Sequence, residues 1–218
     1  MKKAAIIVAG GSGSRMNAPL PKQFLNIANE PILFHTLRKF EDIADQIILV
    51  MHPEWISFWN KIISDSDFKV KHSLVAGGNN RAQSVLNGLN LIEELCLVAV
   101  HDAARPLVSK KLIVSTYENA LLHDACIPVV ELKESIRQVL EDSTSLAVDR
   151  SKFRVVQTPQ TFKSSVLKTA FQTNEFEKYT DEASLVEASG KKIFLIEGEV
   201  TNFKITSPED LTLAQNLI

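Results

Sequence analysis

The stretch AAIIVAGGSGSRMNAPLPK, residues 4–22, joins an apolar run to a glycine-rich segment that carries two cations. Residues 4–9 include no polar side chain, which is typical of a strand buried on both faces of a parallel sheet. Three of the next four residues are glycine, and Arg15 and Lys22 follow. Backbone N–H groups exposed by glycine can hold phosphate oxygens, and Arg and Lys supply the charge that a transferring phosphoryl group needs. The stretch therefore predicts a phosphate-binding loop after the first strand.

This loop fits neither of two common phosphate-binding patterns. A P-loop requires a lysine at a fixed distance after its glycines, and none stands there. A dinucleotide-binding loop requires a third glycine, but position 16 is Met, and Pro19 and Pro21 delay the helix that should follow. A plain glycine-rich turn is the structural alternative, although it would leave Arg15 and Lys22 without a role.

Strands and helices alternate along the rest of the chain. Apolar runs predict strands at residues 46–51, 68–76, 97–101, 125–130, 154–157 and 192–198. Helical spacing and capping residues predict helices at residues 31–42, 53–64, 80–92, 110–123, 163–172, 182–189 and 208–218. This order predicts an α/β fold: a Rossmann-like, doubly wound and mostly parallel sheet whose ligand lies at the carboxyl ends of the strands. The polar stretch 131–150 breaks the alternation, and we expect it to form a protruding β-arm.

Composition and charge narrow the class of protein. The chain of 218 residues is long enough for one α/β domain, and we expect residues 1–218 to form a single one. A net charge of -2 gives no bulk attraction to nucleic acid or to anionic membranes, so neither is expected as a partner. No apolar run is long enough to span a membrane, and the histidines lack the spacing of a zinc site. Cys96 and Cys126 fit buried free thiols, which predicts a cytoplasmic protein.

Six segments stand out in chain order: AGGSGSRMNAPLPKQFL (9–25), GGNNRAQSV (77–85), VHDAARP (100–106), TPQTF (158–162), TDEAS (180–184) and NFKITSPEDL (202–211). Together they resemble the 2-C-methyl-D-erythritol 4-phosphate cytidylyltransferases, a family of sugar-phosphate nucleotidyltransferases. The resemblance implies an enzyme that joins CTP to 2-C-methyl-D-erythritol 4-phosphate with the help of Mg²⁺. The products would be 4-diphosphocytidyl-2-C-methyl-D-erythritol and pyrophosphate, formed by in-line attack on the α-phosphate in non-mevalonate isoprenoid biosynthesis. It also implies a homodimer in which the arm 131–150 crosses to the second subunit, so that the active sites are shared.

The resemblance further implies a role for each residue that matches a family motif. Catalytic roles would fall to Arg15, Lys22, Arg150 and Lys204. The nucleotide would be bound by Ala9, Gly10, Gly11, Ser12, Gly13, Gly78, Asn79, Ser84, Asp102 and Ala103. The sugar phosphate would be bound by Asp102, Arg105, Ser135, Arg150, Thr158 and Lys204. Asp102 would also hold the Mg²⁺, which prefers hard oxygen ligands.

Other residues of these segments are expected to be structural. We expect Arg81 to be an ion-pair partner rather than a ligand. Asp181 and Glu182 are expected to cap their helix and support the site, because a phosphate monoester is already ionised and needs no base to attack. His101 has no second ligand nearby in sequence and is expected to be structural too.

Two other functions stay open at this point. Ribitol-5-phosphate cytidylyltransferases share the opening loop and the TPQ segment, but HDAARP and TDEAS favour the first family. A non-catalytic nucleotide-binding regulatory module would be favoured by loss of Arg15, Lys22 or Asp102, and all three are present. The sequence departs from the family at Asn79, where many members are acidic, and at Ser135, which stands in place of a threonine.

Overall fold

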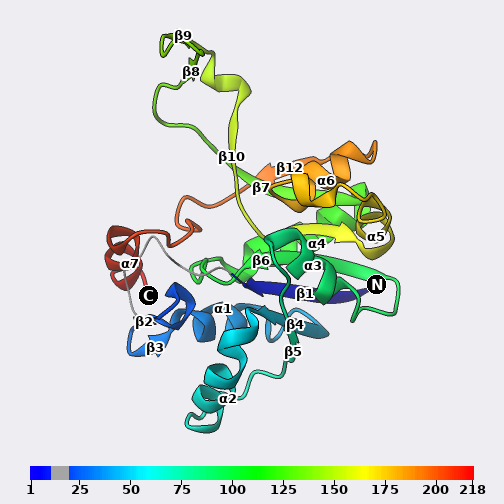
Figure 1. The fold of residues 1–218 in the computed structure, drawn as a ribbon, viewed down its shortest axis with the longest axis vertical. Coiled ribbons are helices and arrows are strands. Elements are labelled where there is room, and N and C mark those ends of the chain that lie inside the picture. The colour runs from blue at the N-terminus through cyan, green and yellow to red at the C-terminus, as the bar shows by residue number, and fades with distance from the viewer. Residues whose placement is uncertain (11–19) are drawn as a thin grey trace.

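The structure of the protein, a computed structural model, describes residues 1–10 and 20–218. Eight of the described strands form one central sheet in the order β10–β7–β11–β6–β1–β4–β5, with β12 alongside β7 (Figure 1). These strands are β1 (Lys2–Ala9), β4 (Gln46–Met51), β5 (Ser73–Ala76), β6 (Cys96–Asp102), β7 (Ala125–Glu131), β10 (Arg154–Val156), β11 (Gln160–Lys163) and β12 (Phe194–Glu197). Four residues with expected roles lie outside the described residues: Gly11, Ser12, Gly13 and Arg15.

The first strand, β1, lies near the middle of this sheet. It pairs in parallel with β4 on one side and with β6 on the other. Ala5 and Ile7 face one apolar cluster, whereas Ala4 and Ile6 face the other. Burial on both faces is the physical reason for the uninterrupted apolar run at residues 4–9. Because the three strands are parallel, their carboxyl ends meet at one edge of the sheet.

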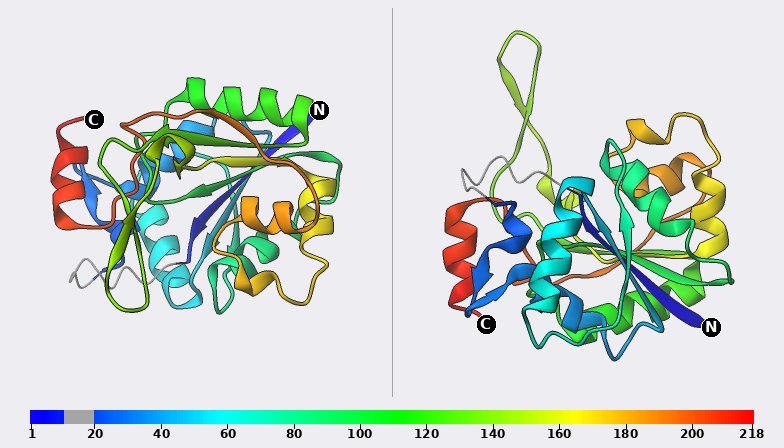
Figure 2. Two further views of the ribbon diagram at one scale, coloured as in Figure 1. Left: turned by 90° about the horizontal axis from the view of Figure 1, so that it is seen from above. Right: turned by 60° about the horizontal axis from the view of Figure 1, so that its bottom comes forward.

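Helices cover both faces of the sheet, which confirms the predicted doubly wound α/β fold. One apolar cluster includes residues of α1, α2 and α4, and the other includes residues of α3, α5 and α6. Figure 2 shows α4 on one side of the sheet and α5 and α6 on the opposite side. The helices are α1 (Ile32–Phe40), α2 (Ile56–Ser64), α3 (Arg81–Leu89), α4 (Lys110–His123), α5 (Ser164–Ala170), α6 (Glu182–Ala188) and α7 (Pro208–Gln215), with short 3-10 helices η2 (Lys22–Phe24), η3 (Pro53–Trp55), η4 (Arg150–Lys152) and η5 (Phe176–Lys178).

The last helix, α7, packs beside the first small hairpin rather than on the central sheet (Figure 1). That hairpin consists of β2 (Asn26–Ile27) and β3 (Glu30–Pro31). Ile27, Ile32, Ile205 and Ala214 form a separate, fully buried cluster between this hairpin region and the C-terminal segment. Residues near the C-terminus are therefore held close to the segment that follows the glycine-rich loop.

The sheet differs from the sequence prediction in two places. The strand expected at residues 68–76 is shorter, because only Ser73–Ala76 pair with β4, although Phe68 and Val70 are still buried. The segment Gln160–Lys163 forms β11, which the sequence did not predict, and it lies antiparallel between β6 and β7. β11 contains buried polar residues that are hydrogen-bonded: the hydroxyl of Thr161, for example, donates to that of Thr116 at 2.9 Å. The strand therefore lacks the apolar run that marks the other inner strands.

The polar stretch after β7 forms the predicted β-arm. β8 (Arg137–Val139) and β9 (Ser145–Ala147) pair as an antiparallel hairpin that has no other strand beside it among the described residues. Figures 1 and 2 show this hairpin projecting well away from the central sheet, at the end of two long connections to β7 and β10. The arm therefore carries its residues away from the body of its own chain.

Helix α3 approaches β1 and β4 closely, and Gly88 makes that approach possible. A Cβ atom on Gly88 would lie 2.9 Å from methyl groups of both Ile6 and Val50. We expect Gly88→Ala to lower the free energy of unfolding by about 1–3 kcal/mol, because an extra methyl group overpacks a filled core. Urea unfolding followed by circular dichroism measures this change.

Gly190 provides the matched control. It has a φ of +85° and no atom within 4 Å of a built Cβ. Asn enters this left-handed conformation at less cost than other side chains, so Gly190→Asn should lower the free energy of unfolding by about 1 kcal/mol or less, through backbone strain without overpacking. Equal stability of Gly88→Ala and the wild-type protein would contradict the close approach of α3.

Candidate active site

The side chain of Asp102 lies at the edge where the carboxyl ends of β1 and β6 meet. It is the last residue of β6, opposite Val8 of β1, and only 7% of its surface is exposed. Three cations surround its carboxylate: Lys204 Nζ lies 3.0 Å from Oδ2, Arg105 Nε lies 3.3 Å from Oδ2, and Arg81 Nε lies 3.7 Å from Oδ1. We call these four residues the Asp102 cluster. Burial alone would raise the pKa of Asp102, but the charges of Lys204, Arg81 and Arg105 outweigh burial and hold this pKa well below its usual range.

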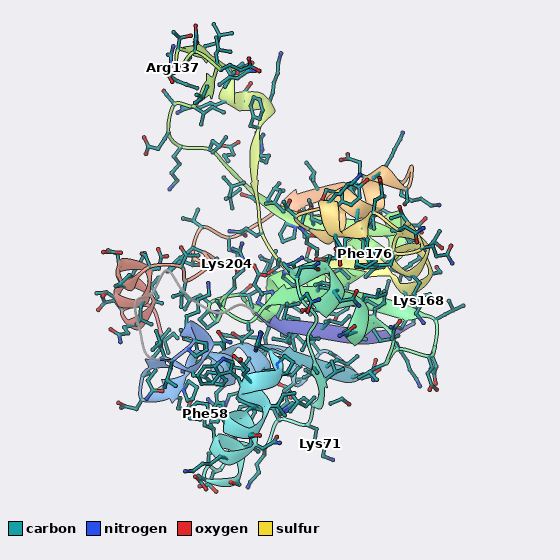
Figure 3. The ribbon with its side chains drawn as sticks, in the orientation of Figure 1. Phe58, Lys71, Arg137, Lys168, Phe176 and Lys204 are labelled. Atoms are coloured by element: carbon teal, nitrogen blue, oxygen red, sulfur yellow. The ribbon has the colours of Figure 1, made fainter. Side chains whose placement is uncertain are left out.

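Separate segments of the chain deliver the cations. Lys204 comes from the connection between β12 and α7, and the next residue, Ile205, donates its backbone N–H to Ala104 O at 2.9 Å. Arg105 follows β6 and donates from Nη1 to the backbone oxygen of Asn202 at 2.8 Å. Figure 3 shows Lys204 between α7 and the central sheet, far from the tip of the arm where Arg137 is labelled. The Asp102 cluster is therefore built on the body of the molecule.

Arg81, the first residue of α3, joins the cluster to a second carboxylate. Its Nη1 lies 2.6 Å from Oε1 of Glu182, whose side chain is 1% exposed. Two neighbouring carboxylates outweigh the effect of burial and raise the pKa of Arg81 further, so the guanidinium stays charged. Arg81 thus makes the ion pairs expected of it, and the expectation that it binds no ligand stays a prediction. Asp181 caps α6 by accepting a hydrogen bond from Ser184 N at 2.9 Å, as the sequence predicted.

The segment after the glycine-rich loop returns to the same edge of the sheet. Lys22 donates from Nζ to the backbone oxygen of Ile205 at 2.8 Å, directly beside Lys204 in the chain. Gln23, which is buried, donates from Nε2 to the backbone oxygen of Ala9 at 2.9 Å and so fixes η2 against the end of β1. The structure thus brings Lys22 and Lys204 to neighbouring positions. It does not describe Arg15, the other cation of the opening stretch.

The loop before α3 lies against the end of β1. Ser84 accepts a hydrogen bond from Gly78 N at 3.0 Å and donates one to Asn80 O at 2.8 Å. A Cβ atom on Gly10 would lie 3.2 Å from the Ser84 hydroxyl, and one on Gly78 would lie 2.1 Å from Cγ of Gln83. The structure therefore brings Gly10, Gly78 and Ser84 of the expected nucleotide site together, and the two glycines stand where a Cβ atom would be crowded. Asn79 is exposed at the tip of the loop.

Two more expected site residues lie next to Asp102 and are buried. Ala103 donates its backbone N–H to Val8 O at 3.1 Å. Thr158 accepts a hydrogen bond from the backbone N–H of Asp102 at 3.1 Å, and its hydroxyl lies 3.0 Å from Nδ1 of His101. The hydroxyl of Thr158 thus supports the position of Asp102, and its expected contact with the sugar phosphate stays a prediction.

Ser135 and Arg150 lie apart from the other expected site residues. Both are exposed on the arm, and Arg150 donates from Nη1 to the backbone oxygen of Lys133. Within the part of the chain that the structure describes, no hydrogen bond or ion pair joins either residue to the Asp102 cluster. Within one chain, the expected site residues therefore fall into two groups, one around the Asp102 cluster and one on the arm.

Sequence reasoning missed the buried amides that hold this edge together. Gln157 and Asn202 join the connection between β10 and β11 to the segment that carries Lys204, and Gln160 donates to Asp181 at 2.8 Å. Two of these amides lie inside segments already quoted for the family resemblance. A side-chain amide that bonds a distant backbone group follows no periodic pattern, so nothing in the sequence marked these residues individually.

The comparisons with known proteins bear directly on this site. The family model for IspD, 2-C-methyl-D-erythritol 4-phosphate cytidylyltransferase, matches residues 3–218 of the chain. The chain belongs to this family. It is 44% identical over 220 residues to the 2-C-methyl-D-erythritol 4-phosphate cytidylyltransferase of Bacteroides thetaiotaomicron, with 100% of both proteins covered. It is also 44% identical to that of Porphyromonas gingivalis, covering 100% of this chain and 98% of the relative.

Solved structures of 2-C-methyl-D-erythritol 4-phosphate cytidylyltransferases share the fold. The crystal structure from Thermus thermophilus has a TM-score of 0.82 at 32% identity, covering 100% of this chain and 98% of that chain. The structure from Francisella tularensis has a TM-score of 0.81 at 33% identity, with 100% of both chains covered. The predicted family, fold class and nucleotidyltransferase activity are confirmed. These relatives are named 2-C-methyl-D-erythritol 4-phosphate cytidylyltransferases, and not ribitol-5-phosphate cytidylyltransferases or regulatory modules. The roles of individual residues stay predictions.

The described residues form neither a cluster of metal ligands nor a membrane-spanning helix. No group of three or more His, Cys, Asp or Glu side chains in residues 1–10 and 20–218 is placed to hold a metal ion. None of the helices in those same ranges has the length and apolar character needed to cross a bilayer. Asp102, the residue expected to hold Mg²⁺, lies at this edge with cations around its carboxylate.

His101 makes the stability of the protein dependent on pH. It is completely buried, its Nε2 lies 3.1 Å from Arg105 O, and burial lowers its pKa from 6.5 to about 4. In the unfolded chain His101 binds a proton as the pH falls below 6.5, whereas in the folded protein it binds one only near pH 4. Stability from this group is therefore fully present above pH 6.5, and we expect about 3 kcal/mol to be lost between pH 6.5 and pH 4.

A non-titrating variant isolates this effect from that of other groups. Urea unfolding of the wild-type protein and of His101→Gln at several pH values from 7 to 4 gives the difference in free energy at each pH. The difference should shrink on acidification, because only the wild-type protein loses the contribution of His101. A difference that stays constant over this range would show that His101 is not held neutral.

Proposed function

We propose that the edge carrying the Asp102 cluster is where this cytidylyltransferase brings its two anionic substrates together. The enzyme joins CTP and 2-C-methyl-D-erythritol 4-phosphate, giving 4-diphosphocytidyl-2-C-methyl-D-erythritol and pyrophosphate for isoprenoid synthesis. The observation that carries the assignment is the concentration of positive charge: three cations lie 3.0–3.7 Å from one carboxylate, and Lys22 lies beside them. Such charge allows two phosphate groups to approach each other.

The reaction proposed here needs no covalent intermediate. An oxygen of the sugar phosphate, already ionised near neutral pH, attacks the α-phosphorus of CTP. One P–O bond forms as the bond to pyrophosphate breaks, and the α-phosphate passes through a state with extra negative charge. Arg15 and Lys22 stabilise that charge. Lys204, whose side chain is 36% exposed, exchanges Asp102 for the attacking phosphate and holds it in line.

Glycine and small residues bind the nucleotide in this proposal. Gly10 and Gly78 lack the Cβ atoms that would crowd Ser84 and Gln83, so the two loops that would line the base lie close to α3, and Ser84 fixes the second loop. Exposed backbone N–H and C=O groups can distinguish cytosine from uracil by the pattern of donors and acceptors. The remaining nucleotide contacts proposed are Ala9, Gly11, Ser12, Gly13, Asn79, Asp102 and Ala103.

The Asp102 carboxylate is the group at this edge to which a divalent cation fits best. Mg²⁺ is commonly held by one or two carboxylates together with substrate phosphates and water, so a large group of protein ligands is not needed. Oδ1 of Asp102 is the less crowded oxygen, because its nearest cationic atom lies 3.7 Å away rather than 3.0 Å. We therefore propose Asp102 as the protein ligand of Mg²⁺, which would neutralise charge on the phosphates of CTP.

A shared active site accounts for the residues on the arm. Across the described residues, Ser135 and Arg150 make no bond to the Asp102 cluster of their own chain, and Val139, Leu146 and Phe153 expose apolar side chains nearby. Exposed apolar surface of this kind marks an interaction site. We propose that residues 1–218 form one domain, that the arm 131–150 dimerises it, and that Arg150 binds the sugar phosphate in the partner's site together with Arg105 and Thr158. Free, buried thiols at Cys96 and Cys126 fit the cytoplasmic location proposed for the enzyme.

The role of Lys22 can be tested by removing its charge. We expect Lys22→Ala to lower kcat by roughly 10² to 10³-fold, because a preorganised contact to the transition state is lost. Release of pyrophosphate from CTP and 2-C-methyl-D-erythritol 4-phosphate is the measurement. Lys168→Ala is the matched control, since Lys168 also donates from Nζ to a backbone oxygen, that of Ile92, but lies far from this edge (Figure 3). Near-normal turnover of Lys22→Ala would remove it from the mechanism.

The shared site can be tested by mixing two inactive variants. Lys22→Ala and Arg150→Ala should each be weakly active alone. If Arg150 serves the partner's site, each mixed dimer has one intact site, and random exchange of subunits should restore about a quarter of wild-type activity. Differently tagged subunits confirm that exchange occurs. No recovery after proven exchange would place Arg150 in the site of its own chain or outside any site.

A further inference from the structure

Asn202 links the two sides of the Asp102 cluster. It lies in the connection between β12 and α7 and is completely buried. Its side-chain Nδ2 donates to the backbone oxygen of Thr158 at 2.9 Å, and its own backbone oxygen accepts from Nη1 of Arg105 at 2.8 Å. One residue thus contacts both Arg105 and the connection between β10 and β11, whose Thr158 hydroxyl bonds the backbone of Asp102.

The same connection is fixed again three residues later. Ile205 donates its backbone N–H to Ala104 O at 2.9 Å and accepts from Lys22 Nζ at 2.8 Å. Lys204 therefore lies between two fixed points of the backbone, at Asn202 and at Ile205. Lysine has a long, flexible side chain, so the place of its ammonium group depends on how firmly its backbone is held.

The amide of Asn202 is used as a donor. Besides Thr158, its Nδ2 lies 3.4 Å from Oε1 of Gln157, which also accepts from Glu199 N at 3.1 Å. Its Oδ1 is buried and has no hydrogen-bond partner among the described residues. A buried acceptor without a partner is unfavourable, so the structure retains Asn here for its N–H groups. Aspartate, which has the same shape, offers no donor when ionised.

We propose that Asn202 is a positioning residue for the sugar-phosphate half of the reaction. It holds the backbone before Lys204 and the side chain of Arg105 in the places from which both cations can meet the attacking phosphate. In the described part of the chain, the hydrogen bonds of Asn202 go to the segments of Thr158 and Arg105 and not to the loops at Gly10 and Gly78. The inference rests on the role proposed above for Lys204.

Kinetics of Asn202→Ala test the inference. We expect KM for 2-C-methyl-D-erythritol 4-phosphate to rise, and kcat to fall, each by roughly tenfold, because a small misplacement of a positioning group costs one to two orders of magnitude. KM for CTP should change by less than about twofold. Asn119→Ala is the matched control, since Asn119 also donates from Nδ2 to a backbone oxygen, that of Ser115 at 2.9 Å. A loss of thermal stability with both KM values unchanged would overturn the inference.

A double-mutant cycle with Lys204→Ala separates this inference from the proposed function. If Asn202 acts partly through Lys204 and partly through Arg105, adding Asn202→Ala to Lys204→Ala should cost roughly tenfold in kcat/KM, instead of the roughly hundredfold loss expected in the wild-type background. Equal losses in both backgrounds would overturn the inference. Near-normal turnover of Lys204→Ala alone would instead contradict the proposed function.

A second substitution covers the case in which Asn202→Ala does not fold. Asn202→Ser keeps a hydroxyl donor in a smaller side chain and leaves a smaller cavity than Asn202→Ala does. We expect the same selective rise in KM for the sugar phosphate, smaller than in Asn202→Ala where both fold. A folded Asn202→Ser enzyme with wild-type constants for both substrates, or with equal changes in both KM values, would overturn the inference.

Discussion

The buried carboxylate of Asp102 is the constraint on which the rest of the structure depends. A charge removed from water is costly unless opposite charges surround it in good geometry. Here the compensation comes from α3, from the turn after β6 and from the connection between β12 and α7, which lie far apart in the sequence. The fold is complete only when these segments converge. The same convergence concentrates positive charge where a nucleotidyltransferase needs it.

Much of this architecture could be predicted from the sequence because each inner parallel strand is buried on both faces. The strand Gln46–Met51 was predicted with the bounds that the structure has, and Asp181 caps its helix as expected. β11 was missed because a short antiparallel strand with buried Gln and Thr has neither an apolar run nor a clear alternation. The stretch 68–72 was wrongly predicted as strand because its buried apolar residues follow a period of two without pairing.

The candidate site could be predicted only in part, because hydrogen bonds between distant residues leave no pattern in the sequence. Asp102, Arg105 and Lys204 each lie in a segment that resembles the family, so the resemblance predicted them as site residues together before any contact was known. Thr158 was assigned to the sugar phosphate, yet its hydroxyl bonds Asp102 N and faces His101. Gln157 and Asn202 act through hydrogen bonds to distant backbone groups, which have no signature in composition or periodicity. Their importance follows from geometry alone.

The small apolar cluster of Ile27, Ile32, Ile205 and Ala214 has a consequence for the order of events during protein synthesis. A ribosome releases the N-terminal part of a domain first, and that part can begin to fold before the rest emerges. β1, β4 and β6 would then be paired while Asp102 still lacks Lys204, which lies far later in the chain. Charge compensation at Asp102 therefore has to wait until the connection that carries Lys204 has been synthesised and has packed against the turn after β6.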